Sequence, residues 1–197
     1  MKLLSFLFLG LLFSCAGWRV ENTPHLGEYP RDLKVEEKIK LKLNFSKYDH
    51  IYNGELKKSS ISDTKKIEMI EEIKQAYIES GIFVFDEKNP DVIADIQIKS
   101  EGEGSLNRAI LTYATLFLVP SSSQTTYTVT TEFKKKDGNV LGTIVKSDTV
   151  EKWQQLFLIF AMPFKYPHSA LKSTLVDLNR ATIVEAHRDD YFREVTE

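Results

Sequence analysis

Residues 125–146 hold the pattern that most limits how this chain can fold. Tyr127, Val129 and Phe133 alternate with threonine and glutamate side chains, and apolar residues return from Val140 onward. Asp137-Gly138 stands between the two runs, and both residue types tolerate the positive φ of a tight hairpin turn. Alternation with a period of two is typical of strands with one buried face. The segment therefore predicts an antiparallel β-hairpin, one face of which must be packed.

Further strands and two helices are predicted on either side of this hairpin. The strands are 33–46, 82–85 and 92–99, the helices run from Ser62 or Asp63 to Gly81 and from Ser169 onward, and 47–60 and 100–105 are loops. This order predicts an α+β domain over residues 33–188, with a mostly antiparallel sheet of four to five strands and two helices packed on one face. The charged residues 189–197 are predicted to form a frayed tail.

The first fourteen residues form a separate unit. One lysine is followed by an apolar run over residues 3–13 and by the small residues Ser14-Cys15-Ala16. This pattern predicts a signal peptide over residues 1–14, and the run is shorter than the about 20 residues of a membrane-spanning helix. Cys15 is the only cysteine, so no internal disulfide can form. Residues 15–32 carry glycine and proline with little periodicity and predict a tether to the domain.

Leu12-Phe13-Ser14-Cys15 resembles the lipobox of bacterial lipoproteins. Leu12 and Ser14 match the pattern, whereas Phe13 stands where a small or aliphatic residue is commoner. The resemblance implies cleavage before Cys15, a diacylglycerol on its sulfur and an acyl chain such as palmitate on its new amino terminus. Two or three such chains hold a protein stably on a membrane. Ala16, in place of an aspartate, resembles cargo that enteric bacteria send to the outer membrane of the cell envelope.

The same residues also fit an ordinary secretory signal. Signal peptidase requires small residues where Ser14 and Ala16 stand, and cleavage after Ala16 would discard Cys15. The two interpretations differ in whether the mature protein carries lipid, and the lipoprotein is the leading one.

Two uncharged apolar segments, 109–119 and 156–164, flank the hairpin. Because the hairpin is antiparallel, the segments at its two ends are predicted to be neighbours. One interpretation is that both are strands or turns buried in the core, as short apolar runs usually are. The other is a contiguous apolar surface for a membrane or a protein partner. Its predicted contact residues are Leu116, Phe117, Leu118, Phe157, Phe160 and Phe164.

Lys38, Lys40 and Lys42 form the only ordered charge feature, on one side of the strand predicted over 33–46. They are the side chains of a solvated strand face in one interpretation. In the other they contact anionic headgroups or lipopolysaccharide phosphates, because like charges on one face sum their fields.

No pattern for catalysis or cofactor binding stands out in the sequence. The four histidines are scattered, which predicts no metal site, and there is no Gly-x-Ser-x-Gly turn or phosphate-binding loop. A formal net charge of −2 gives no field that would recruit nucleic acid. We therefore expect no cofactor and no catalytic residue.

The strand and helix order is similar in layout to small envelope lipoproteins, namely the lipopolysaccharide-assembly lipoprotein LptE and CsgG-like secretion lipoproteins, and to lipoproteins of unassigned function. No diagnostic motif supports this likeness, and layout alone does not transfer function. The leading expectation is a non-enzymatic, lipid-anchored envelope protein that acts through protein or lipid contacts. The alternatives are an envelope hydrolase whose site the sequence does not reveal and a subunit of an oligomeric secretion pore.

Overall fold

The computed structural model describes residues 15–20, 23, 28–30, 33, 37–57, 63–160 and 167–193, without the side chains of 63–66, 159–160 and 167–168. Its strands are β1 (Cys15–Arg19), β2 (Ile39–Tyr52), β3 (Glu55–Leu56), β4 (Phe83–Phe85), β5 (Val92–Gly104), β6 (Ser121–Lys135) and β7 (Val140–Gln154). Its helices are α2 (Asp63–Glu79), α3 (Leu106–Ala114) and α4 (Pro167–Arg188), with a 3-10 helix, η1 (Leu156–Phe160).

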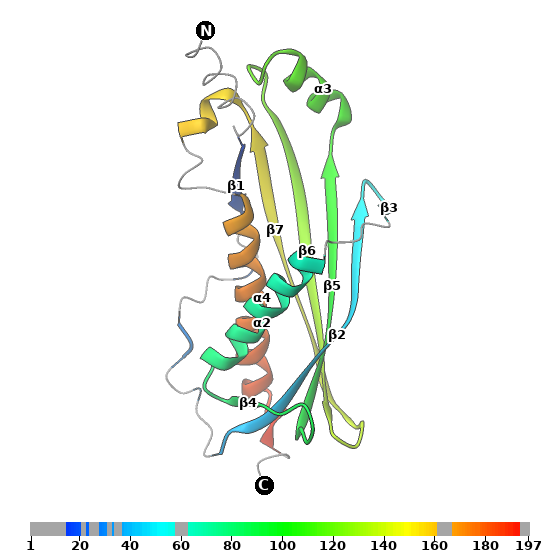
Figure 1. Cartoon of the computed structure of the whole chain (residues 1–197), viewed down its shortest axis with the longest axis vertical. Helices are drawn as coiled ribbons and strands as arrows, with labels where there is room; N and C mark the ends of the chain where they lie inside the picture. Colours follow the sequence, from blue (N-terminus) through cyan, green and yellow to red (C-terminus); the bar gives the residue numbers. More distant parts are fainter. Residues whose placement is uncertain are drawn as a thin grey trace.

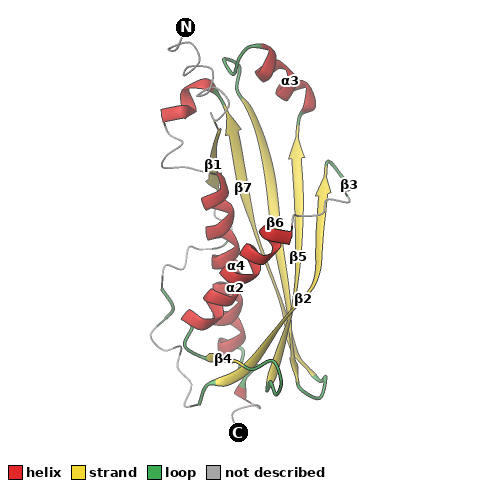
Figure 2. Ribbon diagram, viewed as in Figure 1, coloured by secondary structure: helices red, strands yellow, loops and turns green. Residues whose placement is uncertain are grey.

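The seven strands form one sheet in the order β1-β7-β6-β5-β2-β3, and β4 pairs with the first residues of β2. The predicted hairpin is β6 and β7, and Gly138 has the φ of +90° that its turn requires. Most pairs are antiparallel, but β2 runs parallel to β5 and to β4, because α2 connects them as a crossover. In Figures 1 and 2 the long strands run from one end of the molecule to the other.

Helices α2 and α4 cover one face of the sheet, as Figure 2 shows. α4 contacts β7, β1 and β6, and α2 packs on α4 and β4. Side chains from both helices and from the central strands form the buried core, which includes Ile73, Tyr77, Ile96, Val129, Phe133, Leu175 and Leu178. The mixed fold and the helix-covered face agree with the sequence prediction.

The predicted number of elements was wrong. Within the described ranges there are seven strands and not four to five, and a third helix, α3, stands at the end of the sheet (Figure 1). The loops predicted over 47–60 and 100–105 are largely strand, since β2 extends to Tyr52 and β5 to Gly104. Gly102 and Gly104 allow this extension, because a Cβ on either would lie 2.8 or 2.6 Å from the Tyr52 side chain.

Residues 15–19, predicted to belong to a tether, instead form strand β1. Every residue of β1 pairs with β7, from Cys15 opposite Gln154 to Arg19 opposite Val150. Ala16 is fully buried, and Arg19 forms ion pairs with Asp148 of β7 and Asp177 of α4. Five residues of the predicted tether are therefore part of the folded domain.

The predicted tail, 189–197, also begins inside the domain. Phe192 is 3 % exposed, and its ring centroid lies 5.3 Å from those of Phe83 and Phe133. The Tyr191 ring lies so close to Gly142 that a Cβ there would approach within 2.2 Å. Residues 194–197 of the predicted tail lie outside the described residues.

Candidate functional site at the apolar end of the sheet

The two apolar segments lie together at one end of the sheet, as predicted. The backbone N–H of Leu156, at the start of η1, donates to the carbonyl of Phe117, with an N···O distance of 2.9 Å. In Figure 1, α3 and the turn of η1 both stand at the end of the molecule where β6 begins and β7 finishes. We call this region the apolar end, and define it as residues 106–119 and 156–160.

Neither described segment is a strand. Ser105 begins α3 by accepting a hydrogen bond from the Arg108 N–H, and the hydroxyls of Thr112 and Thr115 donate to carbonyls four residues earlier. The helix ends where Leu116 and Phe117 take positive φ values of 51° and 64°. This backbone conformation is costly for residues other than glycine and is concentrated at functional sites.

The described side chains of the apolar end are mostly exposed. Among the predicted contact residues Leu116, Leu118 and Phe157 are 56 %, 59 % and 64 % exposed, and Phe117 is half-buried. The side chain of Phe160, and Phe164 altogether, lie outside the described residues. The interpretation of these residues as buried core was therefore wrong for Leu116, Leu118 and Phe157, and their contact with a membrane or partner stays a prediction.

Cys15 lies at the same end of the sheet. It is opposite Gln154, which is opposite Ser121, so the three residues form one row across β1, β7 and β6. One apolar segment ends at Val119, just before this row, and the other begins at Leu156, just after it. Burial raises the pKa of the Cys15 thiol above its ordinary value, and the Lys152 ammonium partly offsets this effect.

The predicted lysine contact lies at the other end. Lys40 and Lys42 are at the start of β2, near the row in which Leu41, Val92 and Lys135 pair across β2, β5 and β6. Lys38 and Lys40 are exposed, and Lys42 is half-buried. An anionic partner there would meet a different surface from the one beside Cys15.

A partly buried polar cluster on β2 and β5 was not predicted. The Ser100 Oγ lies 2.8 Å from the His50 Nδ1 and 3.1 Å from the Tyr48 hydroxyl. Ser100 is 1 % exposed, so its hydroxyl is shielded from any substrate in solution. The cluster satisfies polar groups within the sheet, and only the alternation of β2 beyond Phe45 could have indicated it.

Tyr127, next to this cluster, should make the protein sensitive to alkali. Burial and the neighbouring Tyr48 raise the pKa of Tyr127 from 10.0 to about 12. The folded state thus favours the neutral phenol, and this stabilisation is complete below pH 10 and is lost as the pH rises towards 12. We expect the free energy of unfolding to fall over that range, and less steeply in Tyr127→Phe. Denaturant titrations at several pH values measure both slopes, and equal slopes would contradict the assignment.

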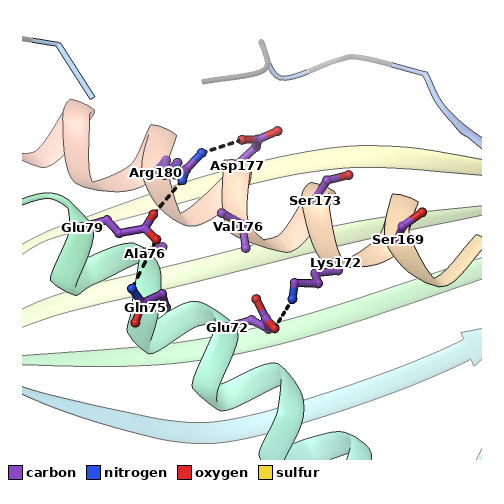
Figure 3. A pocket seen from close by; sticks show the side chains of 10 residues that line it. All are labelled: Glu72, Gln75, Ala76, Glu79, Ser169, Lys172, Ser173, Val176, Asp177 and Arg180. Carbon is purple, nitrogen blue, oxygen red and sulfur yellow. Dashed lines mark hydrogen bonds and ion pairs between the residues drawn. The ribbon is translucent and has the colours of Figure 1, made fainter. Parts of the chain in front are cut away.

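A groove of about 300 Å³ lies between α2 and α4 (Figure 3). Two ion pairs cross it, Lys172 with Glu72 and Arg180 with Glu79, the latter with an N···O distance of 2.7 Å. The hydrogen bond from Arg180 holds the pKa of Glu79 below its ordinary value. These opposite charges satisfy one another across the helix pair, which indicates a structural role.

No helix in the described ranges is long and apolar enough to cross a membrane. The sequence matches no protein-family model and no curated protein. Among solved structures, the chain is weakly similar to a minor lipoprotein from Acinetobacter baumannii. The TM-score is 0.32 and the identity 11 %, over 79 % of this chain and 93 % of that chain, a likeness too distant to indicate a shared role.

Proposed function

We propose that this protein is a lipoprotein of the cell envelope, attached by lipid at Cys15 and acting without catalysis through protein or lipid contacts. One observation carries the proposal: the cysteine of the lipobox-like motif lies at the end of the sheet where apolar side chains are exposed. The membrane that we propose is the outer one, because Ala16 and not an aspartate follows the cysteine.

The structure of β1 supports cleavage before Cys15 over cleavage after Ala16. The first cut leaves β1 whole, with all five residues paired to β7. The second would remove Cys15 together with Ala16, which is fully buried opposite Trp153. Since a buried strand residue contributes to packing and pairing, the later cut would damage the edge of the sheet.

Labelling with radioactive palmitate tests this proposal. We expect the wild-type protein to be labelled and Cys15→Ala to be unlabelled and released from the membrane. Ser14→Ala is the matched control, because it keeps a small residue beside the cysteine and should still be labelled. Mass spectrometry of the mature amino terminus should find it at position 15, and equal labelling of wild type and Cys15→Ala would refute the anchor.

A further inference from the structure

Helix α3 turns its apolar side away from the protein. Leu106, Ile110 and Tyr113 lie on one stripe of the helix and are 72 %, 58 % and 57 % exposed, whereas the buried side chain is Thr112. A surface helix of a globular protein normally has the opposite arrangement, with its apolar stripe on the core. α3 therefore presents a surface suited to an apolar environment outside the protein.

Exposed apolar side chains are concentrated at the apolar end. Of the fifteen large hydrophobic residues that are exposed in the described ranges, seven belong to residues 106–118 or to Phe157. Scattered single residues of this kind are normal, but a contiguous group marks a surface for a membrane or a protein.

The apolar end carries one charge, and it is basic. Arg108 is the only charged residue in 106–119 and 156–160, and the next charged residues along β7 are Lys152 and Glu151. The nearest acidic residues along the chain, Glu103 and Glu151, both pair with Gln124, three residues into the sheet from Ser121. Apolar side chains with basic ones beside them complement a bilayer surface that contains anionic headgroups.

Both tryptophans of the chain lie close to Cys15. Trp153 is opposite Ala16, and Trp18 is three residues from the cysteine on β1. Each is half-buried. Tryptophan is enriched at the level of lipid headgroups, where its ring is partly apolar and its N–H meets water.

The position of Cys15 favours a bilayer, and not a protein partner, as what this surface contacts. Because Cys15 is itself paired in the sheet, a lipid on its sulfur would leave the protein directly at the apolar end, with no tether between them. The acyl chains must enter the membrane, so the surface beside them is held at the membrane as well. A protein partner would have to cover the apolar end and still leave a path for the acyl chains from Cys15 to the membrane.

We infer that the apolar end is inserted into the bilayer that receives the lipid of Cys15, with α3, Leu118 and Phe157 at the level of the headgroups and upper acyl chains. This inference rests on the proposed lipid anchor. It adds that the protein stands on the membrane on a defined surface, with its strands leading away from the bilayer.

Single thiols placed at the two ends of the sheet test the inference. When Cys15 carries lipid, an introduced cysteine is the only free thiol, so Leu118→Cys and Phe157→Cys can each carry an environment-sensitive fluorophore. Val140→Cys is the matched control, because Val140 is 55 % exposed at the far end of β7. The lipidated full chain is reconstituted, at about one molecule per vesicle, into phosphatidylethanolamine–phosphatidylglycerol vesicles that carry a lipid-bound quencher.

We expect the labels at 118 and 157 to be quenched and blue-shifted, and the label at 140 to stay in water. Labels at 118 and 157 that behave like the one at 140 would overturn the inference. Labels that are shielded without lipid quenching would also overturn it, in favour of a protein contact. Fluorophore incorporated at Cys15 of the unsubstituted chain would instead show that the lipid anchor has failed, so the two failures are distinguishable.

A second variant measures what the surface contributes. Leu118→Ser combined with Phe157→Ser removes apolar side chains that are exposed, so the fold should be retained. We expect transfer of the lipidated protein between vesicles to be faster by roughly tenfold or more. Val140→Ser with Val145→Ser, at exposed positions away from this end, should transfer at the wild-type rate. Equal transfer rates for both double variants would contradict insertion.

Discussion

Replacing Arg19 with methionine should lower the free energy of unfolding by about 3–5 kcal/mol, the usual cost of breaking a buried ion pair. The Arg19 Nε donates to Asp148 at 2.5 Å, and its guanidinium also binds Asp177 and the carbonyl of Thr23. The side chains of Asp148 and Asp177 are 0 % and 1 % exposed. Methionine would keep much of the volume and leave two buried carboxylates without this cation. Urea denaturation followed by circular dichroism measures the change.

Lys172→Met is the matched control for Arg19→Met. It removes an ion pair with Glu72 that also joins two elements, but both side chains are substantially exposed. Exposed pairs contribute about 0–1 kcal/mol, so this variant should unfold almost as the wild type does. Adding Asp148→Asn and Asp177→Asn to Arg19→Met should recover part of the lost stability, because it removes the two buried negative charges that Arg19 compensates. A loss below about 1 kcal/mol for Arg19→Met would mean that the ion pairs of Arg19 do not stabilise the packing of β1 on the domain.

Replacing Phe192 with alanine should cost about 3–5 kcal/mol, as for other buried phenylalanines. Its ring packs edge-on against Phe83 of β4 and Phe133 of β6, with centroids 5.3 Å apart in each case. The substitution would leave a cavity between the turn that follows α4 and two strands. The shift in the urea midpoint, together with an unchanged slope, would report this loss.

Tyr113→Ala provides the comparison for Phe192→Ala. Its ring also contacts another aromatic residue, Phe117, at 5.2 Å, but Tyr113 is 57 % exposed. Without a bilayer, this variant should lose no more than about 1 kcal/mol. Similar losses for the two variants would show that residues 189–193 are not part of the core.

The elements that were predicted correctly are those that local patterns specify. Asp137-Gly138 defined the hairpin turn, and Gly81, with φ of 74°, ends the α2 segment. The alternation in β5 and the helical spacing in α4 defined their buried faces. The hairpin also allowed the two apolar segments to be placed side by side, because antiparallel pairing determines which residues meet at its ends.

The elements that were missed depend on distant partners. Cys15 to Arg19 is too short for a clear alternation, and its strand conformation comes from β7 and from the buried Asp148 and Asp177. α3 exposes apolar side chains and buries Thr112, the reverse of an ordinary surface helix. Its sequence therefore does not show the polar outer face by which a surface helix is recognised. Phe192 stands among charged residues near the end of the chain, and only the tertiary fold supplies Phe83 and Phe133 as its neighbours.

The length of the β6–β7 hairpin determines how far its turn lies from Cys15. Each strand has 15 residues, which at about 3.4 Å per residue corresponds to roughly 50 Å between the Cys15 row and the turn at Asp137-Gly138. Because β1 joins Cys15 to this sheet without a tether, the proposed lipid on Cys15 would hold the hairpin rigidly on the membrane. The turn and the lysines at the start of β2 would then be displayed at a fixed distance above the membrane, within reach of partners that never touch the bilayer themselves.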